Sequence, residues 1–318
     1  MSDDSPLAAP ARTAIEQCMG LRDDESCLVV TDDGREAIGE ALLAAAREVT
    51  GDAVIVRYPP GDQHGEEPPR PVAAAMRNAD VVLAPTTKSL SHTRARRQAT
   101  ESGARVATLP GVTEEVFVTG LDADYDSIAS HCRAVYDQVA GAEEIRVTAP
   151  AGTDITFYPG GRAWLQDTGI VHEQSAFSNL PAGETFVSPE SADGTYVVDG
   201  TMMPYGRLEE GQTLEFEVED GVVTHIGDDE IREQVEAAAE EVGEDAYNLA
   251  ELGIGTNVAV TELVGSVLLD EKAAGTVHVA LGDDAGIGGD VEAPLHLDGI
   301  VTEPTVYADG EEIDLPRP

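Results

Sequence analysis

Hydrophobic and polar positions follow two different patterns along the chain, and the pattern changes near residue 144. In the first part, short apolar runs alternate with longer stretches whose apolar residues recur at helical spacing, which predicts buried strands separated by amphipathic helices. The expected strands are 27–31, 53–57, 81–84 and 105–109, and the expected helices are 36–49, 71–78, 93–102 and 125–141. Such an alternation is typical of a parallel sheet covered by helices, so we predict an α/β, Rossmann-like domain over residues 1–143.

Strands and turns dominate from residue 144 onward. The expected strands are short runs rich in β-branched and aromatic residues, at 154–157, 184–188, 195–199, 213–219 and 222–226. One stretch, 230–242, has acids and alanines at helical spacing and predicts an exposed amphipathic helix. We therefore predict an α+β, largely β domain over residues 144–318.

The balance of charge indicates the environment in which the protein works. With 61 acidic residues against 19 basic ones, the net charge is -42 at pH 7. That charge causes self-repulsion in dilute buffer, whereas molar salt shortens the Debye length to about 3 Å and removes most of it. A disordered acidic chain is excluded because the acids are spread throughout and 42% of the residues are hydrophobic. We predict a cytoplasmic protein of a halophilic organism, and the negative field argues against a nucleic-acid partner.

No feature of the sequence predicts export or membrane insertion. Residues 1–11 carry acids where a signal peptide needs a basic start and an apolar core, and no run of about 18 apolar residues follows. We therefore expect no membrane partner. Cys18, Cys27 and Cys132 show no CxxC spacing, so inert thiols in a reducing compartment are expected.

Two histidines and an aspartate near the end of the chain have the chemistry of metal ligands. In His296-Leu297-Asp298 the polar residues are one apart, and in a strand both point to the same face and can chelate one ion. His278 lies in another strand-like run, 276–281. Imidazole and carboxylate groups suit a borderline divalent cation, although a lone buried histidine is also common as a hydrogen-bonded core residue. Phosphate-binding, GxSxG and HExxH motifs do not occur in the sequence.

Several ordered blocks in the second domain point to one enzyme group. They are Asn-Leu-Pro-Ala-Gly-Glu-Thr-Phe-Val-Ser-Pro at 179–189, Ala-Glu-Leu-Gly-Ile-Gly-Thr-Asn at 250–257, Asp-Glu-Lys-Ala-Ala-Gly-Thr-Val-His-Val-Ala-Leu-Gly at 270–282, His-Leu-Asp at 296–298 and Pro-Thr-Val-Tyr at 304–307. In these blocks the chain resembles the M29 aminopeptidases, the group of leucyl aminopeptidase and aminopeptidase T, and more distantly the 2,5-dihydroxypyridine dioxygenases. The resemblance covers most of residues 144–310, whereas the first domain agrees only in its α/β character.

The resemblance implies a set of metal ligands. The M29 aminopeptidases hold two divalent metals, zinc or cobalt, through two glutamates, two histidines, an aspartate and a tyrosine. Block by block, these positions correspond to Glu184, Glu251, His278, His296 and Asp298. The tyrosine has no counterpart, because the segment that follows the first histidine is Asp-Asp-Ala-Gly at 283–286.

Two of these positions, and a lysine close to them in sequence, also have simpler interpretations. Glu184 could be a turn acid on an acidic surface, and Glu251 could accept hydrogen bonds from the backbone amides of the Gly-x-Gly segment after it. Lys272 is one of only two lysines, beside Lys88, which hints that an ammonium is wanted there. A surface lysine without a specific role is an equally good interpretation of Lys272.

Three functions are compatible with these residues. The first is a metallo-aminopeptidase in which two metals activate a water molecule, Glu184 or Glu251 moves its proton, and peptides are the substrates. The resemblance implies a homodimer for such an enzyme. The second function keeps only His278, His296 and Asp298 around one Fe(II), as in the ring-cleaving dioxygenases, and the missing tyrosine favours it. The third is a metal-binding relative without catalytic activity.

Overall fold

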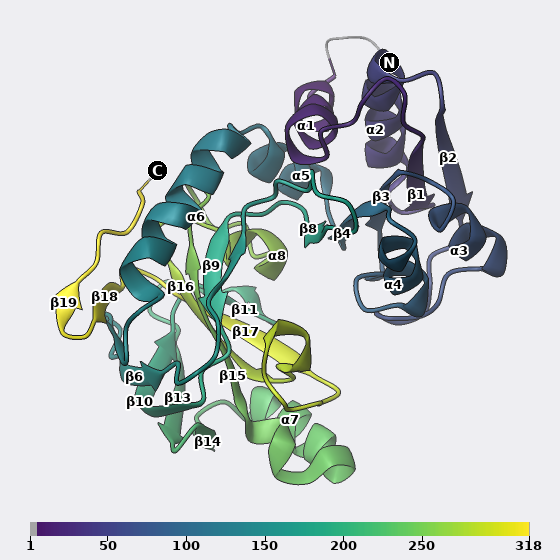
Figure 1. The fold of residues 1–318 in the computed structure, drawn as a ribbon. Coiled ribbons are helices and arrows are strands. Elements are labelled where there is room, and N and C mark those ends of the chain that lie inside the picture. The colour runs from purple at the N-terminus through teal and green to yellow at the C-terminus, as the bar shows by residue number, and fades with distance from the viewer. Residues whose placement is uncertain (1–4, 318) are drawn as a thin grey trace. The chain divides into compact units, whose positions relative to one another are not determined.

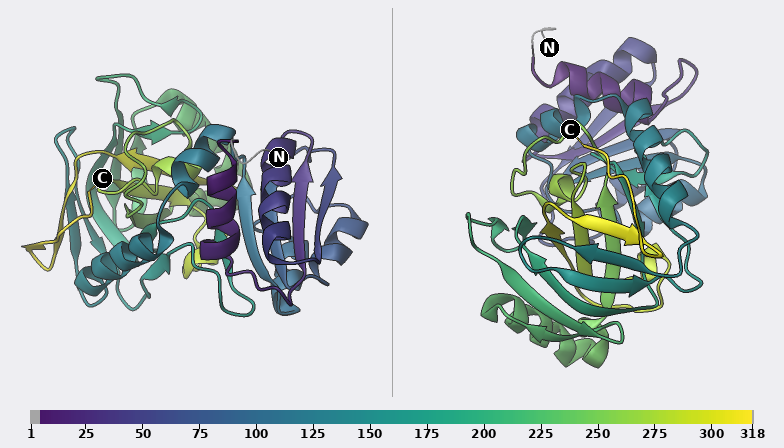
Figure 2. Two further views of the ribbon diagram at one scale, coloured as in Figure 1. Left: turned by 90° about the horizontal axis from the view of Figure 1, so that it is seen from above. Right: turned by 90° about the vertical axis from the view of Figure 1, so that its left-hand side faces the viewer.

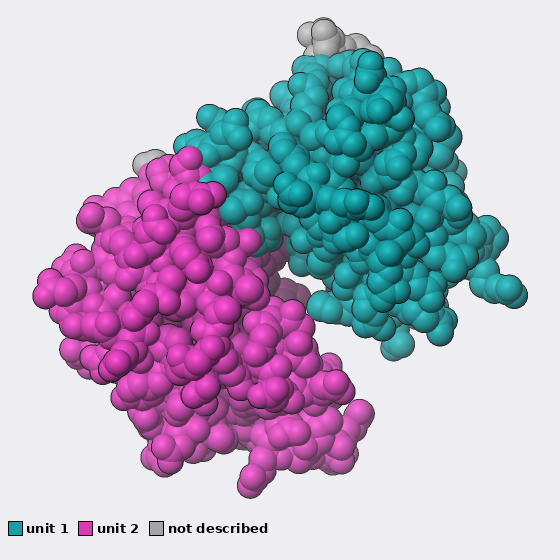
Figure 3. All heavy atoms as spheres, viewed as in Figure 1, with its two compact units in different colours: residues 1–129, 167–182 teal, residues 130–166, 183–318 magenta. Residues whose placement is uncertain are grey.

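The computed structural model describes residues 5–317 and divides the chain into two compact units (Figure 3). Unit 1 comprises Met1–Ala129 and Asp167–Ala182, and unit 2 comprises Ser130–Gln166 and Gly183–Pro318. The sequence pattern placed a single boundary near residue 144. In the structure, unit 2 begins earlier, and the chain returns to unit 1 over Asp167–Ala182.

Unit 1 is built on a five-stranded sheet in the order β2-β1-β3-β4-β8, and all its strand pairs are parallel. The strands are β1 (Cys27–Asp32), β2 (Ala53–Tyr58), β3 (Val81–Thr86), β4 (Arg105–Pro110) and β8 (Phe177–Asn179). The central strands are buried along almost their whole length, which explains their continuous apolar runs. The predicted parallel α/β architecture is confirmed (Figure 1).

Helices cover this sheet on both faces (Figures 1 and 2). They are α1 (Ala8–Arg12), the π-helix η1 (Thr13–Cys18), α2 (Glu36–Val49), α3 (Arg70–Met76), α4 (Arg94–Glu101) and α5 (Glu114–Leu121). The apolar residues of α3 and α4 pack in one cluster with Leu28 and Val30 of β1. On α2, Gly39 lies against Thr31, whose side chain points to the opposite face of β1. Thr93 and Thr113 cap α4 and α5 by accepting hydrogen bonds from backbone amides of the first helical turn.

Two seven-stranded sheets form most of unit 2. The first has the order β14-β13-β10-β6-β5-β18-β19 and consists of β5 (Ile145–Thr148), β6 (Asp154–Tyr158), β10 (Ser191–Val198), β13 (Leu214–Glu219), β14 (Val222–Ile226), β18 (Thr305–Ala308) and β19 (Glu311–Glu312). The second has the order β12-β11-β17-β16-β15-β9-β7 and consists of β7 (Leu165–Asp167), β9 (Glu184–Val187), β11 (Thr201–Met202), β12 (Gly206–Arg207), β15 (Leu249–Gly255), β16 (Val277–Gly282) and β17 (His296–Val301). The largely β character predicted for the second half is confirmed.

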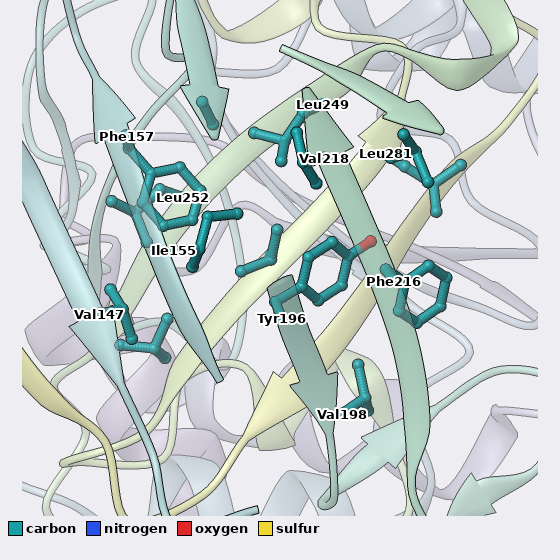
Figure 4. Packing of buried hydrophobic residues seen from close by; sticks show 14 of the residues in the cluster. Val147, Ile155, Phe157, Tyr196, Val198, Phe216, Val218, Leu249, Leu252 and Leu281 are labelled. Atoms are coloured by element: carbon teal, nitrogen blue, oxygen red, sulfur yellow. The ribbon is translucent and has the colours of Figure 1, made fainter. Parts of the chain in front are cut away.

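The core of unit 2 joins the apolar faces of these two sheets (Figure 4). Phe157 and Tyr196 from the first sheet belong to the same buried cluster as Leu252 and Leu281 from the second. The rings of Tyr196 and Phe216 stack with centroids 4.5 Å apart. Helices α6 (Tyr125–Val139) and α7 (Asp229–Val242) add apolar side chains to this cluster, and the shorter elements are η2 (Gly243–Tyr247), α8 (Val267–Asp270) and η3 (Ala285–Ile287). Within residues 5–317, no helix combines the length and the apolar character that a membrane span requires.

A buried ion pair ties the N-terminal segment to the sheet of unit 1. The guanidinium of Arg105 in β4 donates two hydrogen bonds to the Glu25 carboxylate, with N···O distances of 2.8 and 2.7 Å, and a third to the carbonyl oxygen of Met19. Both charged side chains are almost fully buried. This arrangement holds the pKa of Glu25 below its ordinary value, chiefly through the Arg105 hydrogen bonds, which outweigh the effect of burial.

We predict that Arg105→Met lowers the free energy of unfolding by about 3 kcal/mol, because it leaves a buried carboxylate without its main partner. The cost is reduced because Arg22 still contacts Glu25. Urea unfolding in molar KCl, followed by circular dichroism, measures the change. The matched control is Arg146→Met, which breaks an equally bidentate but half-exposed pair with Asp154 and is expected to shift the midpoint little. Equal shifts in the two variants would contradict the prediction.

Candidate metal centre

All five ligands predicted from the sequence lie in one region of the second sheet of unit 2. Strands β9, β15, β16 and β17 are neighbours there, and their antiparallel register sets the positions of the polar side chains. Glu251 of β15 is paired with Ala280 of β16, and Ala280 is paired with Asp298 of β17. We call the group formed by Glu184, Glu251, Glu271, Lys272, His278, His296 and Asp298 the histidine–carboxylate cluster.

Small residues make room for the polar side chains of this cluster. Gly253 of β15 is paired with His278 of β16, and a Cβ atom at residue 253 would lie only 2.0 Å from the imidazole Nε2 of His278. A side chain at this position would therefore displace the imidazole. The Gly-x-Gly segment of the sequence is part of a strand, not the turn that the simpler interpretation of Glu251 assumed.

The first possible ligand group consists of Glu184, Glu251 and His278, all buried. The Nε2 atom of His278 lies 3.2 Å from Oε1 of Glu251 and 3.3 Å from Oε2 of Glu184. Glu184 is only 5% exposed, so it is not the surface acid that was its alternative interpretation. Its Oε2 atom accepts no hydrogen bond from any residue that the structure describes.

The second possible ligand group consists of Glu251, His296 and Asp298. The Nε2 atom of His296 lies 3.4 Å from Oε2 of Glu251 and 3.3 Å from Oδ1 of Asp298. On the other side of the ring, Nδ1 lies 2.7 Å from the carbonyl oxygen of Asp283. A carbonyl can only accept, so Nδ1 carries the proton in this hydrogen bond, and the Nε2 lone pair of the neutral ring faces the two carboxylates.

Glu271 and Lys272 complete the cluster. The ammonium of Lys272 contacts Glu184 and lies 2.7 Å from Oε1 of Glu271, and the lysine side chain is 4% exposed. Lys272 stood out in the sequence because the chain has only two lysines. Its burial shows that it is not a surface lysine. Glu271 was not identified from the sequence, because only the fold shows that this acid at the end of α8 turns toward the ammonium.

Burial and mutual charge shift the pKa values of the whole cluster. Burial raises the pKa of Glu184 to about 8, although the charge of Lys272 opposes the shift. For Glu251, burial also favours the neutral form, but hydrogen bonds with His278 and His296 outweigh it and hold the pKa well below its ordinary value. Burial raises the pKa of Glu271.

The neighbouring carboxylates raise the pKa values of both histidines. Burial disfavours the imidazolium of His278, yet the hydrogen bond with Glu251 and the charge of Glu184 raise its pKa to about 9. The charge of Asp298 likewise raises the pKa of His296 well above its ordinary value, against the effect of burial. In return, the charge of His296 lowers the pKa of Asp298 below its ordinary value, although burial opposes this. Protons on the histidines thus compensate the excess of carboxylates.

The residues of the cluster fit a divalent cation. Four carboxylates face a single ammonium, and the lone pair of neutral His296 is aimed at two carboxylate oxygens, a contact that only a proton or a metal ion makes favourable. The buried Oε2 of Glu184 has no donor among the described residues. The hydrogen bond from His296 to the Asp283 carbonyl is the outer support that a ligating histidine typically has.

A buried aspartate occupies the segment in which the resemblance leads one to expect a tyrosine. The Oδ2 atom of Asp284 accepts hydrogen bonds from Ser188, Asn248 and Arg162, with distances of 2.8, 3.1 and 3.2 Å. Its Oδ1 atom accepts one from the backbone amide of Val291. Asp284 therefore anchors the loop between β16 and β17, which also contains the Asp283 carbonyl that orients His296.

The chain thus combines a parallel α/β unit with a largely β unit that carries a candidate metal-binding cluster. The model of the 2,5-dihydroxypyridine 5,6-dioxygenase family, NicX, matches residues 7–314. The chain belongs to this family. Among proteins of curated function, none matches the sequence significantly.

Two solved structures share the fold over nearly the whole chain. The 2,5-dihydroxypyridine dioxygenase from Pseudomonas putida KT2440 has a TM-score of 0.78 at 19% identity, covering 97% of this chain and 95% of that one. Wild-type AmpT from Thermus thermophilus has a TM-score of 0.67 at 18% identity, covering 97% of this chain and 99% of that one. The resemblance found in the sequence is confirmed, and the homodimer, the peptide partner and the cytoplasmic location stay predictions.

We predict that Asp284→Ala lowers the free energy of unfolding by about 3 kcal/mol, because it removes a buried carboxylate that satisfies several donors. Asp290→Ala is the control, since Asp290 is 97% exposed and pairs with the same Arg162 at 3.6 Å. We expect this control to change stability little. Thermal unfolding of both variants in molar KCl measures the difference, and a stable Asp284→Ala protein would refute the anchoring role.

Proposed function

We propose that the protein is a metal-dependent enzyme that holds one divalent metal at Glu251, His296 and Asp298 and opens a hydroxylated aromatic ring with dioxygen. The family supports the reaction class, because its model is named for the dioxygenation of 2,5-dihydroxypyridine. Fe(II) is the metal that suits this chemistry. The sequence placed His278 in the single-iron set with His296 and Asp298, but the ligand group that contains those two residues has Glu251 in its place, and His278 belongs to the other group.

The buried ammonium of Lys272 is the observation that carries the one-metal proposal. It contacts Glu184 and neutralises one carboxylate of the group formed by Glu184, Glu251 and His278. A second divalent cation in that group would share Glu184 with the ammonium, and two cations side by side in a buried site repel each other strongly. Lys272 therefore takes the place of a second metal.

The residues around the metal position have distinct roles in this proposal. When bound, the metal supplies redox activity toward dioxygen and Lewis acidity toward the hydroxyl groups of the substrate. Asp283 holds His296 in the tautomer that offers Nε2. Glu184, with a pKa near the operating pH, accepts the proton of a substrate hydroxyl. His278 lies between Glu184 and Glu251, with its Nε2 atom facing both, and stabilises the negative charge of the two carboxylates.

A metallo-aminopeptidase is the second candidate, and the position of Glu251 favours it. One oxygen of this carboxylate faces His278 and the other faces His296, as expected of a carboxylate that bridges two cations. In this case zinc or cobalt would activate a water molecule, Glu184 would accept the proton of that water, and peptides would be the substrates. The two candidates differ in metal count and in the co-substrate consumed.

We expect one Fe(II) per subunit when the protein is loaded without oxygen in molar KCl and its metal is counted by mass spectrometry. The ion should be lost in His296→Ala and Asp298→Ala and kept in His225→Ala, a control on an exposed histidine of β14. The loaded protein should consume oxygen with 2,5-dihydroxypyridine. Two zinc ions per subunit with hydrolysis of leucine p-nitroanilide would instead establish the aminopeptidase, and metal without either reaction would indicate a non-catalytic relative.

Lys272→Gln tests the role of the ammonium directly. Without its positive charge, Glu184 attracts a second divalent cation, so we expect zinc binding to rise from one to two ions per subunit. Arg207→Gln, on the exposed strand β12, is the control for a lost positive charge and should leave the count at one. A folded Lys272→Gln protein that still binds a single ion would remove the main support for the one-metal proposal.

A further inference from the structure

A pocket in unit 1 lies apart from the histidine–carboxylate cluster in the sequence and belongs to a different unit. It has a volume of about 300 Å³, at the lower end of the range for small-molecule sites. Its walls come from the segment after β2, from the segment just before α3, and from the segment after β3. Because β2 and β3 flank β1 in a parallel sheet, the pocket lies at the carboxyl edge of the strands, where open α/β sheets bind ligands.

The walls of the pocket are mostly apolar and flat. Tyr58 ends β2, and two pairs of prolines at 59–60 and 68–69 line the cavity together with Leu90. Proline rings and a tyrosine ring offer rigid surfaces with little conformational entropy to lose, which suits a flat ring. Gly65 and Ser89 join the two loops through a backbone hydrogen bond of 2.9 Å. This hydrogen bond links the loop after β2 to the loop after β3, and both contribute to the walls.

Lys88 is the only basic residue that lines the pocket, and it is half-buried. It makes no ion pair with any residue in the described part of the chain, although the protein has 61 acidic residues. The other lysine of the chain, Lys272, is fully engaged by Glu184 and Glu271. An ammonium without an acidic partner inside the chain is available to an anionic group from outside it.

The two acids of the pocket are directed elsewhere. Oε2 of Glu66 accepts a hydrogen bond of 2.6 Å from the backbone amide of Asp62, and the carboxylate of Glu67 accepts from the amides of Arg94 and Ala95 at the start of α4. Neither glutamate forms an ion pair with Lys88, but the negative charges of both repel a dianion from the pocket. A single ammonium beside two carboxylates disfavours a dianion such as phosphate more strongly than a monoanion.

We propose that this pocket binds a small aromatic monocarboxylate, with the ring between Tyr58 and the prolines and the carboxylate on the Lys88 ammonium. A ligand bound in the pocket would contact both the loop after β2 and the loop after β3. The site is independent of the metal and of the reaction proposed for unit 2.

Isothermal titration of metal-free protein with benzoate in molar KCl tests this site. We expect saturable binding that weakens about tenfold in Lys88→Gln, because a charged hydrogen bond to the carboxylate is lost. Lys88→Arg should retain most of the affinity. Arg77→Gln, on an exposed arginine at the end of α3, should bind as the parent protein does, and so should His296→Ala, which disables the cluster of unit 2.

Benzamide, which has the same shape without the charge, should bind at least about tenfold more weakly than benzoate. Equal binding of benzamide, or unchanged benzoate binding in Lys88→Gln, would overturn the proposal. So would saturable binding of inorganic phosphate without binding of benzoate. Loss of benzoate binding in His296→Ala would place the ligand in unit 2 and also exclude the pocket.

Discussion

An excess of buried negative charge is the constraint on which the second unit depends. Glu184, Glu251, Glu271 and Asp298 face one ammonium and two imidazoles, and their mutual repulsion must be balanced by protons or by a metal ion. A sheet is well suited to hold such a cluster, because the register of its strands is fixed by the large apolar core behind it. The core thus supplies the rigidity that the charged face needs.

The register also explains why small residues accompany the charged ones. Gly253 leaves space for the His278 imidazole, and Ala280 separates Glu251 from Asp298 across three strands. The loop after β16 then returns to orient His296 through the Asp283 carbonyl, while Asp284 holds the loop in place. The apolar packing, the sheet and the loop each position a different part of one site.

Membership of the dioxygenase family and the likeness to AmpT fit a shared scaffold whose chemistry depends on a few residues. In the proposal made above, the buried ammonium of Lys272 beside Glu184 is the feature that favours one metal over two. An ammonium at this position places one positive charge beside Glu184, and the chemistry of such a scaffold depends on the residues of its site and not on the fold alone.

Periodicity in the sequence determined strands β1 to β4 of the parallel sheet, helices α2, α3 and α4, and the largely β second half, because apolar patterning follows directly from which faces are buried. The sequence blocks also singled out Glu184, Glu251, His278, His296 and Asp298 as candidate ligands, and the structure brings them together. The return of Asp167–Ala182 to unit 1 was not visible, since a short strand such as β8 has too few residues to show a pattern. Only the tertiary structure grouped Glu251 with His296 and Asp298, turned Glu271 toward Lys272 and left Lys88 without a partner in its pocket. These features depend on strand register and on distances between side chains remote in sequence, which a one-dimensional pattern does not encode.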